Sequence, residues 1–329
     1  MVVRTLNQVT GPSLNKIARW KTLRRDIWRA RWAYIFITPF LIIFLVFNIF
    51  PPLYSAWLSF HQWDILTPIK SIGFANYIRI FTRDQLFWKS ILNGVLMGVM
   101  ATIPGLFSAL LLAYILDVFA RKYRHIFMAA YFSPRITSAV AVGMTFGALF
   151  GGVGLINYAL RSLGIPPVRW LEEVWSLRAT LAFLLLWEWT GWNIVIFTSG
   201  LQSIPFELYE SAMVDGANGW DMFWKITIPM VRPTIIFTGV MSTIGILQLF
   251  AEPMLLIPGA SNGNGASLLG GQDNAILTTP LYLYNIAFRQ FQFGLASAQS
   301  YILFAVILSL ALINSKILGG RTTTEEGAI

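Results

Sequence analysis

Residues 91–116 read ILNGVLMGVMATIPGLFSALLLAYIL and contain no charged side chain. An α-helix rises about 1.5 Å per residue, so about 20 apolar residues cross the hydrocarbon core of a bilayer. A stretch this long and this free of charge is not typical of a core helix in a soluble domain. It predicts a membrane-spanning helix.

The composition of the whole chain supports the same class of protein. Of the 329 residues, 56% are hydrophobic and 12% are charged, and the mean hydropathy is +0.63. An average soluble domain has about 25% charged residues, so the composition excludes an ordinary soluble protein as well as a disordered one. The net charge of +9 alone suits a nucleic-acid binder, but such proteins are richer in charged side chains, and we expect no nucleic-acid partner. The predicted fold class is an all-α integral membrane protein.

Cysteine is absent from the sequence, and histidine occurs only as His61 and His125. Disulfides, thiolate metal ligands and cysteine nucleophiles are therefore excluded. Two isolated histidines also predict neither a metal site nor a catalytic triad.

Six stretches are long and apolar enough to cross a membrane, and we place them at 34–58, 91–116, 126–150, 179–200, 233–256 and 295–318. An even number of spans puts both termini on one side. The positive-inside rule places that side in the cytoplasm, because eight basic residues precede position 33. The predicted organisation is a cytoplasmic basic segment at 1–33, a transmembrane domain at 34–318 and a cytoplasmic tail at 319–329. Within the basic segment, residues 16–31 fit an interfacial amphipathic helix, or a stop signal that only fixes the topology.

The connection between spans four and five, 201–232, reads LQSIPFELYESAMVDGANGWDMFWKITIPMVR and is the most informative stretch. It carries four acidic residues on the predicted cytoplasmic side, against the positive-inside trend. Pro205 is well placed to start a short helix, and Gly216 permits the left-handed residue of a turn. A second short segment follows, which we expect Pro229 to end. Two short helices outside the membrane indicate a docking surface for a cytoplasmic partner, or a segment that lies among lipid headgroups.

This connection resembles the EAA loop of the membrane subunits of binding-protein-dependent ABC importers, which reads Glu-Ala-Ala, three residues, Gly, nine residues, Ile-x-Leu-Pro. Here Glu210-Ser211-Ala212 precedes Gly216 by the same three residues, and Ile226-Thr227-Ile228-Pro229 follows after nine. The stretch 201–217 is similar to the carbohydrate-uptake branch of that family, the MalF-like sugar permeases. So are the segments at 54–60, 73–77 and 293–298, and the resemblance covers roughly 34–318.

The resemblance implies a function in which the loop forms coupling helices that fit a cleft in a cytoplasmic ATPase subunit. It implies as partners two copies of that ATPase, a second permease (expected to be different from this one), an extracytoplasmic solute-binding protein and a sugar substrate. It also implies the bacterial cytoplasmic (inner) membrane as the location. The residues expected to couple to the ATPase are Glu210, Ser211, Ala212, Asp215, Gly216, Ala217, Ile226 and Pro229. The chain has no GxxxxGK[ST] sequence, so we expect no cofactor on it and no ATPase site, with ATP and Mg²⁺ on the partner ATPase.

A group of polar and aromatic residues in span four is a candidate for the substrate pathway. Glu188 and Trp192 are i, i+4 neighbours on a helix, as are Trp189 and Asn193, and the four occupy an arc of about 140°. Carboxylates and amides bind hydroxyl groups, and indoles pack against the apolar face of a sugar ring, so these residues predict a sugar site. In the alternative interpretation, Glu188 bonds a polar group of the partner permease and the tryptophans fill that interface.

Two further spans each contain a charged residue. Gln248 and Glu252, near the outer end of span five, are candidates for a gate or for a contact with the binding protein. For Arg135, which follows Pro134, we expect a structural role in which it pairs with a carboxylate or with carbonyls freed at the proline.

Other classes of transporter are less consistent with the sequence. An ABC permease for an amino acid or oligopeptide is the main alternative. An ion-coupled secondary transporter typically has internal repeats and clustered ion ligands, which we do not find. A membrane enzyme would need a cluster of acids, histidines or serines at a catalytic spacing.

Overall fold

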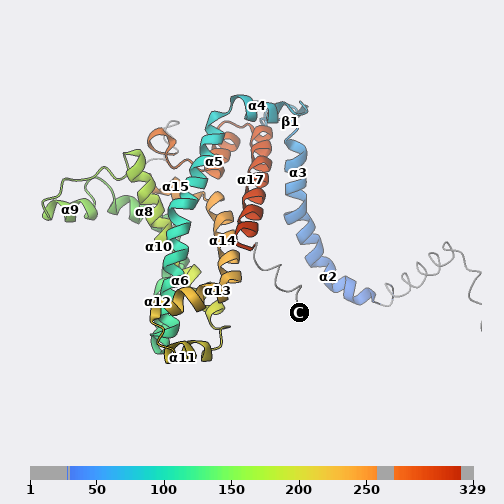
Figure 1. Cartoon of the computed structure of the whole chain (residues 1–329). Helices are drawn as coiled ribbons and strands as arrows, with labels where there is room; N and C mark the ends of the chain where they lie inside the picture. The colour runs from blue at the N-terminus through green and yellow to red at the C-terminus, as the bar shows by residue number, and fades with distance from the viewer. Residues whose placement is uncertain (1–27, 29, 258–269, 320–329) are drawn as a thin grey trace, which may run out of the picture. The chain divides into compact units, whose positions relative to one another are not determined.

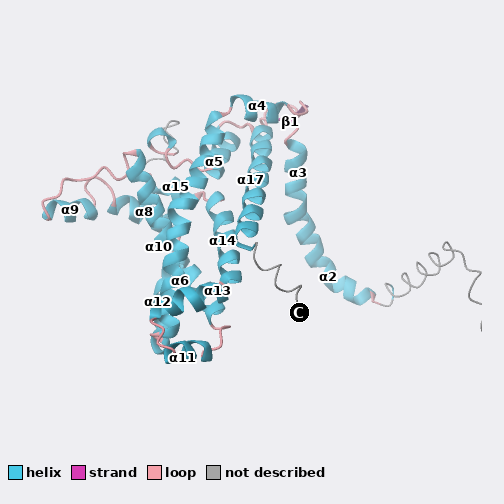
Figure 2. Ribbon diagram, in the orientation of Figure 1, coloured by secondary structure: helices cyan, strands magenta, loops and turns pink. Residues whose placement is uncertain are grey.

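A computed structural model of the chain describes residue 28, residues 30–257 and residues 270–319. Within these residues the fold is helical apart from a hairpin of two-residue strands, β1 (His61–Gln62) and β2 (Lys70–Ser71), as Figures 1 and 2 show. The predicted all-α fold is therefore confirmed. Most of the basic segment, including nearly all of residues 16–31, and most of the tail at 319–329 lie outside the described residues.

The chain divides into two units, Met1–Trp57 and Leu58–Ile329. In the first unit, α2 (Arg31–Phe44), a π-helical turn η1 (Leu45–Ile49) and α3 (Phe50–Leu58) form one apolar helix of 28 residues. The π-turn directly precedes Pro51 and Pro52, which lack the backbone N–H that a regular α-helix needs. No side chain of α2 or η1 is buried. A helix that is apolar on all sides and unburied fits a surrounding of lipid or of another membrane subunit.

Helix α10 (Val174–Leu201) is the centre of the second unit. It packs along α6 (Ile103–Val118), which continues α5 (Gln85–Met97) through the π-turn η2 (Gly98–Thr102) as one long helix. Further along the chain, α14 (Arg232–Leu247) packs against α17 (Phe293–Gly319), seen in orange and red in Figure 1. Leucines at 177, 181, 184 and 185 of α10 are buried in the main apolar cluster. Such burial makes α10 the helix against which the other elements are positioned.

The third and fifth predicted spans, 126–150 and 233–256, are not continuous helices. In the third, the helical segment Arg121–Ile136 bends by 91° into α8 (Ala139–Leu149). That segment contains η3 (Arg121–Tyr123), α7 (Arg124–Phe132) and the 3₁₀ turn η4 (Ser133–Ile136), and Pro134 lies where α7 gives way to η4. A proline removes a helical hydrogen bond, which accounts for the break at this position.

The break in the fifth span lies between α14 and α15 (Ala251–Leu256). Pro253 has no N–H to give to the carbonyl of Leu249, one turn earlier. That carbonyl instead accepts a hydrogen bond of 2.7 Å from the hydroxyl of Thr278. Backbone groups freed inside a membrane must find such partners, so a residue far along the chain stabilises the break.

Four helices of the described residues are long and apolar enough to cross a membrane. Up to six spans result if two bent pairs, Arg121–Ile136 with α8 and Gly219–Met230 with α14, each count as one. At one end of the bundle lie α11 (Glu207–Val214) and α12 (Gly219–Met222), and at the other end lies α4 (Ala75–Arg83) (Figure 1). The connections carry the remaining short helices, which are α9 (Leu155–Ser162), α16 (Thr279–Tyr284), the 3₁₀ turn η6 (Gln272–Asn274) and the π-turn η7 (Asn285–Arg289).

Candidate functional site

The predicted helix–turn–helix is present in the connection after span four. Helix α11 ends at Val214, and Gly216 follows in the left-handed region with φ +81°. The amide of Gly216 bonds the carbonyl of Met213, and the amide of Ala217 bonds the carbonyl of Ala212, which is the hydrogen-bond pattern of a Schellman motif. The role of Gly216 as the turn residue is confirmed.

The second helical segment of this loop does not end where the sequence predicted. It runs from α12 through the π-turn η5 (Phe223–Thr227) into α13 (Ile228–Met230), and Pro229 lies inside it. The chain bends by 72° only between Met230 and Arg232, where α14 begins. Proline is tolerated in the first turn of a helix, and α13 starts afresh after the wider turns of η5, so Pro229 does not break the segment. We call residues 201–232, with α11, α12, η5 and α13, the coupling loop.

One face of the coupling loop is anchored to the bundle. Tyr209 and Phe223 are buried beside Tyr114 of α6. The Tyr209 hydroxyl lies 2.9 Å from Oγ1 of Thr227, and the Tyr114 hydroxyl donates to the carbonyl of Gly219 at 2.9 Å. Burial raises the pKa of Tyr209, so its phenol stays protonated and keeps this hydrogen bond at physiological pH. The two halves of the loop are thereby fixed to each other and to α6.

The opposite face of the coupling loop is exposed. Glu210, Ser211, Asp215 and Gly216 are exposed, as is Pro229, while Ala212, Ala217 and Ile226 are half-buried. Large apolar side chains lie among them, and Val214 is 88% exposed. An exposed apolar patch flanked by acids has the chemistry of a protein-docking surface.

The charged residues of spans three, four and five converge inside the bundle. Nη1 of Arg135 donates to Oε1 of Glu188 at 2.8 Å, and the Arg135 guanidinium lies 5.3 Å from the centre of the Trp189 ring. Glu252 is close enough to interact electrostatically with both Arg135 and Glu188. The structure thus confirms that Arg135 pairs with a carboxylate, a contact between residues 53 positions apart that no local pattern reveals. We call Arg135, Glu188, Trp189 and Glu252 the charged cluster.

The helices α7 and α10 touch closely beside this cluster. A Cβ atom on Gly191 would clash with the carbonyl oxygen of Tyr131, so only glycine permits the approach. The ring of Trp192 lies 6.2 Å from that of Phe132, and Trp192 is 47% exposed. Glu188 and Trp192 therefore share the side of α10 that faces the break in span three.

Trp189 and Asn193 contribute to a second side of α10, which packs against α14. A Cβ atom on Gly245 of α14 would clash with the ring of Trp189, so this ring lies against α14. Together with Ser242, the two residues line a cavity of about 10 Å³, which has room for one water molecule and none for a sugar. Gln248 is exposed at the C-cap of α14, and Glu252 is buried in the first turn of α15. The four predicted pathway residues of α10 thus fall on two sides of this helix, and the other two lie at the break in span five.

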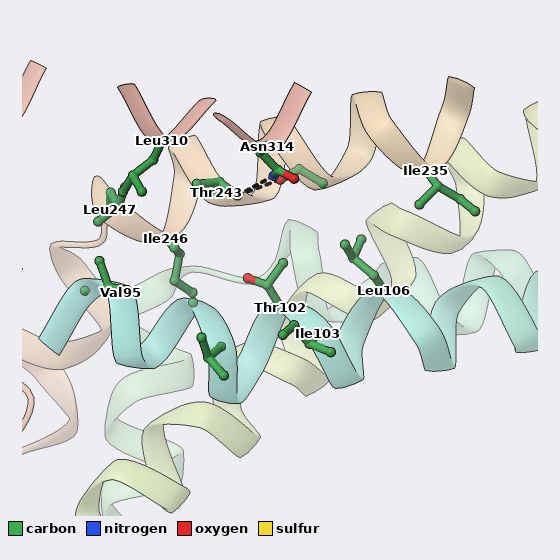
Figure 3. A pocket seen from close by; sticks show the side chains of 14 residues that line it. Val95, Thr102, Ile103, Leu106, Ile235, Thr243, Ile246, Leu247, Leu310 and Asn314 are labelled. Carbon is green, nitrogen blue, oxygen red and sulfur yellow. Dashed lines mark hydrogen bonds between the residues drawn. The ribbon is translucent and has the colours of Figure 1, made fainter. Parts of the chain in front are cut away.

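The cavity shown in Figure 3 lies elsewhere in the bundle, between α5–α6, α14 and α17. It has a volume of about 420 Å³ and is lined mostly by apolar side chains. Its polar groups include Thr243 and Asn314, whose side chains bond each other at 3.1 Å. None of the predicted pathway residues lines it, and its chemistry does not fit a hydroxyl-rich solute.

Two arrangements are thus present in one helical membrane protein, an anchored docking loop at one end and a charged cluster among the spans. Both arrangements fit a subunit of a membrane transporter. The chain belongs to the family of binding-protein-dependent transport system inner membrane components, whose family model matches residues 75–318. The chain is therefore a permease subunit of an ABC importer, and ATP hydrolysis is not its own activity.

Relatives and solved structures agree with this assignment. The chain is 32% identical over 283 residues to the lactose transport system permease protein LacF of Rhizobium radiobacter, covering 85% of this chain and 91% of LacF. It is also 32% identical over 313 residues to the arabinooligosaccharides transport system permease protein AraP of Bacillus subtilis, covering 94% of each. Among solved structures, one chain of a bacterial alginate ABC transporter matches with a TM-score of 0.75 and 24% identity. The match covers 92% of this chain and 98% of that one, and that transporter was crystallised with an alginate pentasaccharide-bound periplasmic protein. This last match shows a shared fold.

Proposed function

We propose that this chain is a membrane-spanning permease subunit of an ATP-driven sugar importer in the bacterial cytoplasmic membrane. The relatives LacF and AraP are permeases for lactose and for arabinooligosaccharides, which supports a sugar as the solute. The observation that carries the coupling part of the proposal is the coupling loop, in which Gly216 turns the chain at the motif position and one face stays exposed.

In this proposal the chain crosses the membrane six times, with each of the two broken spans counted as one crossing. Both termini lie in the cytoplasm, on the side of the coupling loop, since the basic residues gather there. The transmembrane domain comprises residues 34–318.

The exposed face of the coupling loop docks into a cytoplasmic ATPase, of which two copies serve the transporter. Glu210 and Asp215 supply charged contacts, Ser211, Ala212 and Ala217 allow close approach, and Gly216 fixes the angle between α11 and α12. Ile226 and Pro229 hold the second half of the loop. ATP and Mg²⁺ bind to the ATPase, and this chain holds no cofactor.

The solute passes between this chain and a second, different permease after delivery by an extracytoplasmic binding protein. Glu188 and Trp192 line this pathway, with Trp189 and Asn193 on the adjoining side of α10. Gln248 and Glu252 flank it at the break in span five. The exposed indole of Trp192 supports a sugar solute, because an indole packs well against the apolar face of a sugar ring.

Reconstitution of the complete transporter into vesicles tests the proposal. With the ATPase, the second permease and the binding protein present, labelled sugar should enter only when ATP and the binding protein are both supplied. A variant with Glu210→Ala should assemble but lose most ATP-driven uptake, whereas Glu173→Ala at the other end of α10 should behave as wild type. Uptake that follows an imposed ion gradient without ATP would instead identify a secondary transporter. An amino acid or peptide on the binding protein would identify a permease for another solute.

A further inference from the structure

The break in span three exposes polar side chains in the middle of an apolar span. Ser133, Arg135, Thr137 and Ser138 are all exposed in this chain, and Thr137 has an extended backbone with ψ 144°. Non-helical backbone and charged groups at membrane depth are tolerated only where protein or water covers them, because lipid offers no hydrogen bonds. This face of the break therefore does not face lipid.

Arg135 is the charged group that the break presents. Its side chain is 40% exposed, whereas the side chain of Glu188, its partner, is 4% exposed. The carboxylate is thus covered more than the guanidinium, and the same guanidinium lies over the ring of Trp189. Glu188 accepts from one guanidinium nitrogen, Nη1, and a guanidinium has five N–H donors, so this exposed side chain has further donors to offer.

The arrangement neutralises the charge of Arg135 without using up its donors. An ion pair of this kind favours uncharged hydroxyl groups as ligands, because the guanidinium needs no second anion. The half-exposed ring of Trp192 lies beside Phe132, the residue that precedes the break, and offers an apolar surface next to these donors. A sugar presents both kinds of surface, hydroxyl groups at its edge and C–H groups on its face.

We infer that the break at residues 133–138 lines the solute pathway and that Arg135, held by Glu188, is the residue that contacts the solute's hydroxyl groups. This inference rests on the proposed function and changes the role of Glu188, which positions Arg135 and does not itself face the solute. The solute class is an uncharged, hydroxyl-rich molecule.

Because the chain contains no cysteine, single cysteines introduced into the assembled transporter test whether the break faces water. Ser138→Cys should react with the membrane-impermeant cationic reagent MTSET about tenfold or more faster than Phe304→Cys, an exposed position in the apolar stretch of α17. Tyr158→Cys on the exposed helix α9 gives the rate of a freely accessible thiol. If Ser138→Cys reacts no faster than Phe304→Cys, the break is covered by protein or lipid and the inference is wrong.

A comparison of MTSET with the anionic reagent MTSES at Ser138→Cys tests the role of Arg135. With the ion pair intact, the ratio of the two rates should match that at Tyr158→Cys. Adding Glu188→Gln should shift the ratio about tenfold toward MTSES, because the cluster then loses the carboxylate charge that is hydrogen-bonded to Arg135. Combining Arg135→Gln with Glu188→Gln removes one charge of each sign, so the net charge of the cluster, which still contains Glu252, is unchanged and the ratio should return to its original value.

A ratio that does not respond to Glu188→Gln would show that Arg135 is not presented to the pathway. These rates are measured without solute transport, so they fail independently of the proposed function. Once the sugar on the binding protein is identified, the paired Gln variant should raise the KM for its uptake about tenfold or more, with assembly unchanged and Arg135→Lys intermediate. An unaltered KM, or a uronate as the bound sugar, would also overturn the inference.

Discussion

Replacement of Gly216 isolates the contribution of one backbone angle to coupling. A Cβ atom at this position would meet nothing within 4 Å, so a larger side chain creates no clash. The cost comes only from φ +81°, a left-handed conformation that costs L-residues roughly 1–2 kcal/mol. It is lower for asparagine and higher for a β-branched residue such as valine.

A cost of this size changes the population of the native turn by a factor of about 5–30. We therefore expect Gly216→Asn to transport nearly as well as wild type, Gly216→Ala to lose uptake a few-fold, and Gly216→Val to lose most of it. The assay is ATP-driven uptake into vesicles, measured together with ATP hydrolysis. Because the anchored face of the coupling loop is untouched, all three variants should remain in the membrane, and hydrolysis should become uncoupled from uptake in Gly216→Val.

Gly164 provides a matched control for this series. It has φ +76° and also meets nothing within 4 Å, but it lies in the connection after α9, far along the chain from the coupling loop. Gly164→Val should impose a similar local strain and leave coupling intact. If Gly216→Val transports as wild type does, or if Gly216→Asn is as harmful as Gly216→Val, the angle at this turn does not carry coupling.

Three further outcomes test the packing and the charged cluster. Gly191→Ala should destabilise the bundle by about 1–3 kcal/mol or more, because its methyl group meets the Tyr131 carbonyl. Gly105→Ala in α6, where the methyl group has free space, is the control. Thermal unfolding in detergent compares the two variants, and equal midpoints would contradict the close contact. Tyr209→Phe should lower the stability of the coupling loop by about 1 kcal/mol, because the hydrogen bond to the hydroxyl of Thr227 is lost. The variant should therefore bind the ATPase more weakly. An unchanged yield of ATPase in a pull-down would refute this prediction. Glu188→Ala should impair solute-stimulated transport more than assembly with the ATPase, and unaltered uptake kinetics would exclude span four from the pathway.

The positions of the spans were predictable because the signal is local. Length and absence of charge decide whether a segment crosses a bilayer, and neither depends on what the segment packs against. The predicted stretch at 295–318 corresponds to α17, and 179–200 corresponds to the longer α10. Gly216 was predictable for a similar reason, since a glycine between two short helices signals a left-handed turn.

The continuity of the spans was not predictable in this way. The sequence contains prolines in several spans, and they act differently according to what satisfies the freed carbonyls. At Pro253 the carbonyl of Leu249 is satisfied by Thr278, which lies 29 residues along the chain. The π-turns η1 and η5, by contrast, let the chain continue as a helix near Pro51 and Pro229. A proline therefore marks a possible break, and only the tertiary contacts decide whether the helix ends there.

The charged cluster shows the same dependence on tertiary contacts more strongly. Helical periodicity correctly placed Glu188 and Trp192 one turn apart, and Trp189 and Asn193 likewise. But α10 is surrounded by other helices, so the arc is divided between the break in span three and α14. The greater exposure of Arg135 relative to Glu188 depends on where the chain bends between η4 and α8.

The two functional regions thus differ in how the sequence encodes them. The coupling loop is built from consecutive residues whose angles and caps are locally determined, as the Schellman bonds at Gly216 and Ala217 show. A motif of this kind can be recognised in one sequence, because its geometry does not depend on the solute. The charged cluster draws one charged residue from each of three spans, and two of these spans are broken. Which of these groups lie together therefore depends on the geometry of both breaks, which no run of consecutive residues encodes.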